Sequence, residues 1–286
     1  CGKCIHSCPF GAIGSKTYIV NVIDAIKAED KHVYAMVAPA TEGQFGPNII
    51  MNSWKKAMQA VGFNGFVEVA LGADMTAAYE ADEWLEAYEA GEKKVTSCCP
   101  GFVNMVRKHY PDLADKISTT VSPMCAVSRM IKAKDPDAVT VFVGPCVAKR
   151  KEAQRDEAVD FVMTFEEISS IFDAFEINLE IVQPYAMEFS SVREAHGFAQ
   201  AGGVMGAVKA FLKMEADKIN AIQVSDLNKK NIGTLRAYAK SGKAPGQFIE
   251  VMACEGGCIT GPSTHSGSNN GKRQLVQELA KQKKTY

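Results

Sequence analysis

The sequence lacks several features that mark common functional classes. Its 32 Lys and Arg nearly balance its 33 Asp and Glu, so no strong electrostatic field points to nucleic acid or an anionic membrane as a partner. No apolar run approaches the roughly 18 residues of a membrane span, and no signal-peptide pattern opens the chain. No repeat of short fixed period is visible. These absences favour a soluble, cytoplasmic globular protein with no nucleic-acid or membrane partner.

Cysteine, in contrast, is abundant and clustered. Nine cysteines occur among 286 residues, and an odd number in tight groups fits metal ligation or redox chemistry better than a secreted disulfide framework. The 47% hydrophobic content is ample for one large domain or two modest ones. The question is therefore what the cysteine clusters hold.

Residues 1–14, CGKCIHSCPFGAIG, place Cys1, Cys4 and Cys8 in the spacing C-x2-C-x3-C-P. This matches the last three cysteines of the bacterial ferredoxin run C-x2-C-x2-C-x3-C-P; the alternative is a cysteine-rich turn that arose by chance. We expect Cys1 and Cys4 to bind one 4Fe-4S cluster and Cys8 a second, each completed by residues upstream. Residues 1–20 would be the truncated end of a ferredoxin-like α+β domain, and residues 21–286 a second domain.

Beyond residue 32, apolar strand patterns alternate with amphipathic helix patterns. Repeated strand–loop–helix units indicate an α/β fold with parallel sheets, in which ligands gather at the carboxyl ends of strands. Three of these ends carry cysteine, in TSCCPGF, GPCVAKRKE and EVMACEGGCITGP. Strands are expected to open the segments 32–46, 65–71, 94–102, 138–153, 161–175 and 247–263, and helices are expected within 48–63, 73–94 and 267–286.

Four cysteines from those three strand ends, Cys99, Cys146, Cys254 and Cys258, are the number that a 4Fe-4S cluster requires. The Gly-Gly pair at 256–257 would let the backbone approach a bulky inorganic core closely. Four thiolates also suit a structural zinc ion. Spacing alone therefore leaves zinc as an alternative.

The three loops resemble the signature loops TSCCPxW, MPCxxKxxE and ExMxCxxGCxxG of the FeFe (iron-only) hydrogenases. The resemblance extends from the ferredoxin-like start to about residue 263, and three motifs in the same order make it specific. The matching positions are Thr96, Ser97, Cys98, Cys99 and Pro100, then Pro145, Cys146, Lys149 and Glu152, then Glu250, Met252, Cys254, Gly257, Cys258 and Gly261.

The resemblance implies two α/β lobes, with parallel or mixed sheets flanked by helices, around a buried H-cluster. This cofactor is a 4Fe-4S cubane joined through a cysteine sulfur to a two-iron unit with CO, cyanide and a dithiolate. Cys258 would supply the joining sulfur, and Lys149 would donate to a cyanide. Without the resemblance, Lys149 would be interpreted as a solvated surface lysine. Ala38, Pro39 and Met252 would line the pocket. The cubane ligands would be Cys99, Cys146, Cys254 and Cys258.

Two adjacent cysteines, Cys98 and Cys99, need separate roles. Neighbouring Cα atoms lie about 3.8 Å apart, too close for an ordinary disulfide, which spans roughly 4.4 to 6.8 Å. The resemblance makes Cys99 the cubane ligand and Cys98 a proton shuttle, continued by a relay through Glu80, Ser118 and Glu83. Glu80 and Glu83 are expected to share a helix face. The alternatives are a small buried hydrophobe for Cys98 and solvated carboxylates for the two glutamates.

Several residues depart from the family pattern. Phe102 replaces Trp, Ala40 replaces Ser, Gly144 replaces Met and Met124 replaces Gln. Losing donors and packing around the cofactor is expected to shift its redox potential, and these departures look more like the group B branch than group A. Cys125 matches no ligand position and is expected to be a core residue.

The function that the resemblance implies is reversible hydrogen oxidation and proton reduction. Ferredoxin or another redox protein would exchange electrons, and maturation proteins would supply the two-iron unit. One alternative is a hydrogen sensor on the same scaffold. The other is a narf-like iron-sulfur assembly protein, which shares the fold and the cubane ligands without the two-iron chemistry.

Overall fold

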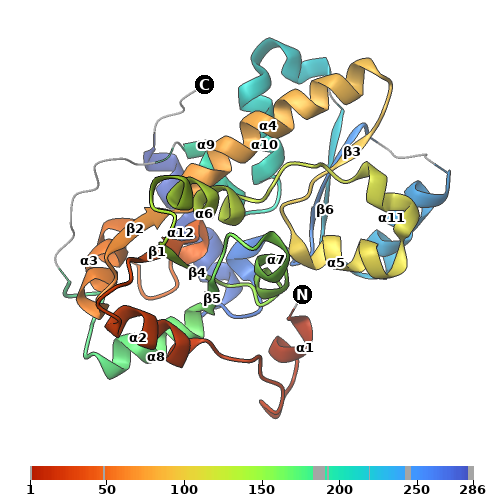
Figure 1. The fold of residues 1–286 in the computed structure, drawn as a ribbon. Helices are drawn as coiled ribbons and strands as arrows, with labels where there is room; N and C mark the ends of the chain where they lie inside the picture. The colour runs from red at the N-terminus through yellow and green to blue at the C-terminus, as the bar shows by residue number, and fades with distance from the viewer. Residues whose placement is uncertain are drawn as a thin grey trace.

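The structure, a computed structural model, describes residues 2–47, 49–182, 191, 193–218, 220–241 and 246–282. Cys1, expected to bind an iron-sulfur cluster, lies outside the described residues. Figure 1 shows one sheet toward the left of the view and another toward the right, with helices packed against both. All strand pairs in both sheets are parallel, which confirms the expected α/β fold with parallel sheets.

The first sheet contains four strands in the order β2-β1-β4-β5. Side chains alternate between the faces of a strand, so the odd-numbered residues of β1 and β4 face a core formed with helices α3 and α8. The even-numbered residues face helix α6. The bounds are Val33–Val37 (β1), Gly65–Glu68 (β2), Val139–Gly144 (β4), Phe161–Thr164 (β5), Met51–Val61 (α3), Pro123–Lys134 (α6) and Phe165–Ala174 (α8).

The second sheet contains three strands in the order β3-β7-β6. Its two faces are covered differently: Ile249 and Val251 of β7 pack with α5 and α11, whereas Phe248 and Met252 pack with α4 and α10. The sequence analysis did not identify β6, α10 or α11. The bounds are Lys94–Val95 (β3), Ala221–Ser225 (β6), Phe248–Met252 (β7), Ala70–Glu89 (α4), Pro100–His109 (α5), Gly203–Leu212 (α10) and Lys229–Ser241 (α11).

Helix α4 links the two sheets, because it contacts both α6 and α10. It follows β2 directly and so begins before the expected start at Ala73. A Cβ atom on Gly72 would lie 2.2 Å from the carbonyl oxygen of Pro123, so only glycine allows α4 and α6 to approach this closely. The close packing buries one face of α4 between the lobes.

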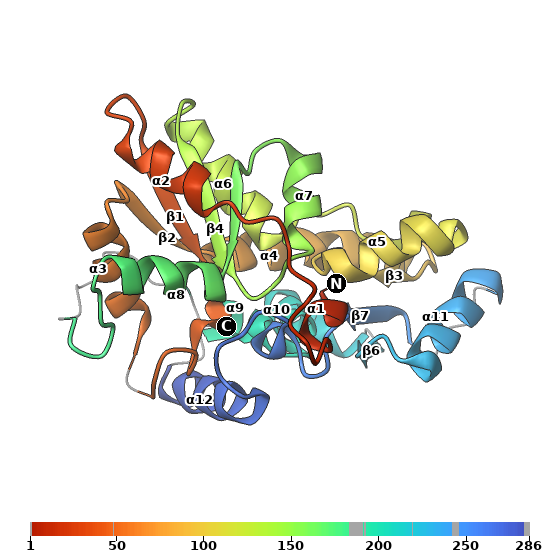
Figure 2. The same ribbon diagram turned by 90° about the horizontal axis from the view of Figure 1, so that it is seen from below.

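The N-terminal segment lies along the two lobes (Figure 2). A Cβ on Gly2 would meet the side chains of Pro262 and Val147 at 2.6 and 2.8 Å, so the segment contacts two of the cysteine loops. Helix α1 is Lys3–His6, and helix α2, Ile19–Lys27, buries Val22 in the core of the first sheet. The expected domain boundary at residue 20 therefore falls inside α2. None of the helices in the described ranges has the length and apolar character needed to cross a membrane.

Candidate metal centre and proton relay

The three cysteine loops follow the carboxyl ends of β3, β4 and β7. Cys99 is the N-cap residue of α5, with Pro100 as the first helical residue, whose fixed φ favours the turn. Cys146 follows the end of β4, whereas Cys254 and Cys258 follow the end of β7. The first and third loops meet because β3 and β7 are parallel neighbours in one sheet, and the Ala253 N–H donates to the Cys99 sulfur at 3.3 Å. The Cys146 loop comes from the other sheet and meets the third loop where the Ser263 N–H donates to the Pro145 carbonyl at 3.1 Å.

The four thiols are close enough to perturb one another. Burial raises the pKa of Cys254 to about 12, with contributions from Cys146 and Cys99. Burial also raises the pKa of Cys258 well above its ordinary value, and the other three cysteines add to the rise. Without a metal, the thiols of Cys254 and Cys258 are therefore neutral, and metal binding must displace their protons.

The arrangement argues against the zinc alternative. Within the described ranges, no three His, Cys, Asp or Glu side chains are placed to hold a single metal ion. Four partly buried thiols, three of which have pKa values raised by burial and by their cysteine neighbours, fit the donor set of a larger cluster. The site thus suits a 4Fe-4S cubane better than a structural zinc ion.

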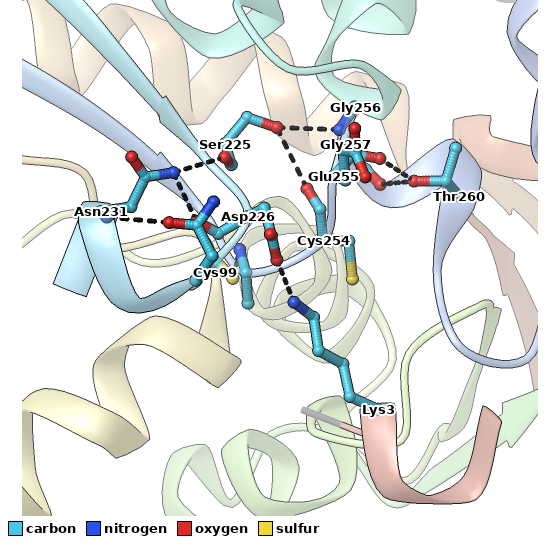
Figure 3. A network of polar contacts seen from close by, with 12 residues as sticks. Lys3, Cys99, Ser225, Asp226, Asn231, Cys254, Glu255, Gly256, Gly257 and Thr260 are labelled. Carbon is cyan, nitrogen blue, oxygen red and sulfur yellow. Dashed lines mark hydrogen bonds and ion pairs between the residues drawn. The ribbon is translucent and has the colours of Figure 1, made fainter. Parts of the chain in front are cut away.

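Polar contacts fix the loop that carries Cys254 (Figure 3). The Ser225 hydroxyl donates to the carbonyl of Cys254 at 3.3 Å and accepts from the N–H of Gly256 at 2.8 Å. The Asn231 amide donates to the carbonyls of Ser225 and Asp226 at 2.8 and 2.7 Å. Lys3 forms an ion pair with Asp226. The N-terminal segment is therefore joined to the loop of a proposed cubane ligand.

The glycines at 256 and 257 are also required by the protein itself. Both have positive φ, +84° and +100°. A Cβ on Gly257 would lie 2.5 Å from the backbone nitrogen of Ala201, and one on Gly256 would lie 2.3 Å from the Lys272 side chain. The loop's own turn and the packing of neighbouring chain therefore need glycine at both positions.

A small cavity lies beside the cysteine loops, with a volume of about 70 Å³. We call it the inner cavity. Its wall is mostly apolar, and Met124, Ala40 and Phe198 contribute to it. The residues singled out from the sequence that line it are Ala38, Pro39, Cys98, Cys146, Lys149, Met252 and Cys258.

Phe142 explains how the chain tolerates glycine at position 144. A Cβ on Gly144 would lie 2.7 Å from the Phe142 ring and 3.1 Å from the Cβ of Ala38. The ring therefore occupies the space that a side chain at 144 would need, and it also lines the inner cavity. Sequence reasoning identified the change at Gly144 and missed its partner two residues earlier.

Lys149 is buried at the start of α7, Lys149–Asp156, not exposed on the surface. Its ammonium lies 2.7 Å from the Glu152 carboxylate, 3.0 Å from the Ser122 hydroxyl and 3.4 Å from the carbonyl oxygen of Cys98. Burial lowers the pKa of Lys149, but the charge and hydrogen bond of Glu152, together with the charges of Cys125 and Cys146, outweigh this effect and raise the pKa above its ordinary value. The inner cavity is therefore bordered by a fixed cation, which suits an anionic ligand.

Glu80 is completely buried, so the alternative of a solvated carboxylate is wrong for it. Neither carboxylate oxygen has a hydrogen-bond partner in the described part of the chain. Burial raises the pKa of Glu80 to about 8, against opposing contributions from the Ser97 N–H and the Ser118 hydroxyl. At neutral pH Glu80 carries a proton.

Glu83 lies one turn further along α4, and its pKa is shifted in the opposite direction from that of Glu80. It accepts hydrogen bonds from the Ser118 hydroxyl at 2.6 Å and the Thr119 N–H at 3.0 Å, and it pairs with Lys94 at 3.1 Å. Burial opposes ionisation, but the hydrogen bonds from Ser118 and Thr119 and the charge of Lys94 lower the pKa of Glu83 overall. Its side chain is 15% exposed, so it is not freely solvated either.

Cys98 completes this series on the cavity side. Its side chain is buried, and burial followed by the charge of Glu80 raises its pKa well above the ordinary value. Glu80 contributes to the pKa shift of Cys98, and Ser118 contributes to the pKa shift of Glu80. The Ser118 hydroxyl in turn donates a hydrogen bond to Glu83. The structure thus brings together four residues from three segments of the chain, in a series leading from the inner cavity toward the surface.

A family model described as "Iron only hydrogenase large subunit, C-terminal domain" matches residues 31–262. The chain belongs to this family. The match covers all three cysteine loops, the inner cavity and the residues of the relay.

Curated relatives agree with this assignment. The chain is 28% identical to the NADP-reducing hydrogenase subunit HndD of Solidesulfovibrio fructosivorans, over 91% of this chain and 54% of the relative. It is 29% identical to iron hydrogenase 1 of Clostridium pasteurianum, over 88% of this chain and 53% of the relative. The chain therefore spans about half the length of these relatives.

Solved structures share the fold. The apo [FeFe]-hydrogenase of Chlamydomonas reinhardtii, in a variant form, aligns with a TM-score of 0.77 at 21% identity, covering 94% of this chain and 91% of that chain. Membership in the iron-only hydrogenase family implies an H-cluster. Four partly buried thiols, a fixed cation and a small apolar cavity are a set of groups that fits this cofactor.

Glu250 is a buried residue of the third motif to which the sequence analysis gave no role. Its carboxylate accepts from the backbone N–H of Gly202 at 2.6 Å and of Met205 at 2.8 Å, at the start of α10. Burial raises the pKa of Glu250 to about 7. In this iron-only hydrogenase domain Glu250 therefore joins β7 to α10. Cys125, as expected, is a buried core residue.

Proposed function

We propose that this domain interconverts hydrogen with protons and electrons at an H-cluster bound beside the inner cavity. When bound, the H-cluster supplies the open iron site for this reaction. One observation supports the proposal most: Cys98 and Lys149, a buried thiol and a buried cation, line the same cavity as Cys146 and Cys258. A protein that held only a cubane would need neither group.

In this proposal four cysteines hold the cubane and the cavity wall holds the rest of the cofactor. Lys149 binds an anionic ligand, and Glu152 and Ser122 keep its ammonium oriented. Ala38, Pro39 and Met252 present apolar surface and exclude water from the reacting atoms. The cubane ligands are Cys99, Cys146, Cys254 and Cys258.

Protons travel between the cavity and the surface through the relay. Cys98 exchanges a proton with Glu80, which holds one at neutral pH. The Ser118 hydroxyl accepts a proton from Glu80 while passing its own to Glu83 across their 2.6 Å hydrogen bond. Glu83, with its lowered pKa, releases the proton toward solvent. In the reverse direction each step runs backwards.

Electrons enter through the N-terminal segment. Cys4 and Cys8 would bind clusters within a ferredoxin-like domain ending near residue 20, and the Lys3–Asp226 ion pair holds this segment against the Cys254 loop. Ferredoxin or a similar redox protein would be the partner, and maturation proteins would supply the two-iron unit. The group B assignment belongs to this proposal, carried by Ala40, Met124 and Gly144.

A second candidate function is supported by the comparisons themselves. The chain is 24% identical to the cytosolic Fe-S cluster assembly factor narfl of Danio rerio, over 88% of this chain and 76% of the relative. An assembly factor would use the same cubane cysteines. Cys98 and Lys149 in the inner cavity favour the hydrogenase proposal over this one.

The experiment is artificial maturation under anaerobic conditions, followed by infrared spectroscopy of the CO and cyanide stretches and a hydrogen-evolution assay. Bands with turnover are the expected result. Bands with negligible turnover would favour a sensor, and a loaded cubane without bands would favour an assembly factor. Cys98→Ser should keep the bands and reduce turnover by orders of magnitude, whereas Cys125→Ser, the matched control, should change neither. Unchanged turnover in Cys98→Ser would remove Cys98 from the relay.

A further inference from the structure

A second, larger cavity of about 410 Å³ lies outside the relay, and we call it the outer cavity. Hydroxyl-bearing side chains, among them Ser118, Thr119 and Thr120, form part of its wall. Its volume far exceeds the roughly 30 Å³ that one water occupies in the liquid, and its wall is polar, so it is hydrated. Ser118 therefore connects the relay to a wet chamber.

The charges around the outer cavity do not cancel. Its two carboxylates are already paired: Glu152 lies 2.7 Å from Lys149, and Asp156 lies 2.7 Å from Arg129. Arg107 and Arg155 also line the cavity, and no carboxylate among the described residues pairs with either. With both acids neutralised by other cations, the two guanidinium groups leave a local excess of positive charge.

The two arginines line the same chamber. Arg155 donates only to neutral oxygens, the Asn104 amide at 2.8 Å and the Lys151 carbonyl at 3.1 Å. Burial and then the charge of Arg107 lower the pKa of Arg155, against smaller opposing contributions from Glu152 and Cys125, so each guanidinium is within range of the other's field. Arg107 is exposed and makes no hydrogen bond with the described residues. Like charges held close together without a counterion are stabilised by an anion.

We propose that the outer cavity binds a small oxyanion, such as inorganic phosphate, between Arg107 and Arg155. The guanidinium groups supply planar pairs of N–H donors that match an oxyanion's geometry. The hydroxyls of Thr119 and Thr120 donate to Glu83 instead, so they contribute a hydrated wall rather than ligand contacts.

The position of this site gives the anion a role. Ser118, the relay residue that donates to Glu83, lines the same cavity, so a bound oxyanion that is a weak acid lies beside the outer half of the relay. Dihydrogen phosphate can release one proton to the water and hydroxyl at Ser118 and leave as hydrogen phosphate; the reverse exchange removes a proton. This role as a proton carrier rests on the proposed function, whereas the binding site does not.

The site is tested by titrating the metal-free chain with inorganic phosphate in a calorimeter at constant ionic strength. Arg107→Met should weaken binding about tenfold or more, the effect of losing a charged hydrogen bond. Lys108→Met removes a neighbouring exposed cation outside the cavity and should leave the affinity unchanged. Arg107 has no described partner, so its variant should fold. No phosphate binding to the wild type, or equal weakening in both variants, would overturn the site.

The carrier role is tested on the loaded enzyme at fixed pH and ionic strength. The rate of hydrogen evolution should rise with phosphate concentration in the wild type. In Arg107→Met the slope of this response should be smaller, by the same factor as the loss of phosphate affinity. A response of equal slope in both proteins would overturn the carrier role. If the loaded protein shows no turnover at all, the proposed function fails, and phosphate binding to the metal-free chain still decides the site.

Discussion

Glu80→Gln should stabilise the metal-free protein in a pH-dependent way. The pKa of Glu80 is raised from 4.5 to about 8 in the folded protein by burial, with a smaller contribution from Glu83. Because the pKa is raised in the folded protein, the contribution of Glu80 to the free energy of unfolding is fully present below pH 4.5 and is lost as the pH rises through 8. At pH 7 the unfolded chain ionises this carboxyl and the folded protein does not. At 1.36 kcal/mol per pKa unit, this costs roughly 3 kcal/mol.

Glutamine has a similar shape and cannot ionise, so it removes this cost. The free energy of unfolding of Glu80→Gln relative to wild type should be near zero at pH 4.5 and higher by roughly 3 kcal/mol at pH 7. Urea unfolding at several pH values measures the difference. Glu86→Gln removes an exposed carboxylate from the same helix and should change stability by less than about 0.5 kcal/mol throughout.

The same substitution separates stability from function. In the matured protein Glu80→Gln should retain the infrared bands of the cofactor and lose turnover by orders of magnitude, because the amide cannot exchange a proton with Cys98 or Ser118. A stability difference that does not change with pH would refute the buried, protonated state of Glu80. Full turnover in a folded, loaded variant would refute its place in the relay.

Three further predictions concern the two cavities and their walls. Lys149→Met should cost about 1–3 kcal/mol of unfolding free energy, because it leaves the partly buried Glu152, on the wall of the hydrated outer cavity, without its ion-pair partner, and adding Glu152→Gln should recover much of this cost in urea unfolding. Gly144→Ala should destabilise the protein by about 1–3 kcal/mol through its clash with Phe142, and adding Phe142→Leu should relieve the clash. Equal melting temperatures for Gly144→Ala and the wild type would contradict this packing. Cys258→Ala should abolish the infrared bands of the two-iron unit, and their persistence would overturn its assignment as a ligand.

The cysteine loops could be predicted because their positions depend on local sequence and a simple topological rule. Each loop follows an apolar strand, and parallel strands bring their carboxyl ends to one edge. This rule places the Cys99 and Cys254 loops together, because β3 and β7 are neighbours in one sheet, but Cys146 follows β4 of the other sheet, and its approach depends on how the two sheets pack. The pairing of β6 beside β7 was not predicted, because the short segment Ala221–Ser225 has only a weak alternation of apolar residues.

The electrostatics of the relay could not be predicted, because burial on α4 depends on elements distant in sequence. The helix carries several glutamates, and its pattern does not distinguish a buried Glu80 from an exposed Glu86. The difference arises because α6 approaches at Gly72 and α10 packs against the other end. One glutamate thereby loses water and retains its proton, while Glu83, three residues later, keeps its charge through Ser118, Thr119 and Lys94.

This contrast gives the relay a gradient. A proton held by Glu80, whose pKa is about 8, lies between a thiol of still higher pKa at Cys98 and a carboxylate of lowered pKa at Glu83. In the resting protein, proton affinity therefore falls from the cavity toward the surface. Glu83 thus releases protons readily and takes them up only rarely at neutral pH, so proton reduction, which needs uptake, is the direction in which a carrier anion beside Ser118 would matter most.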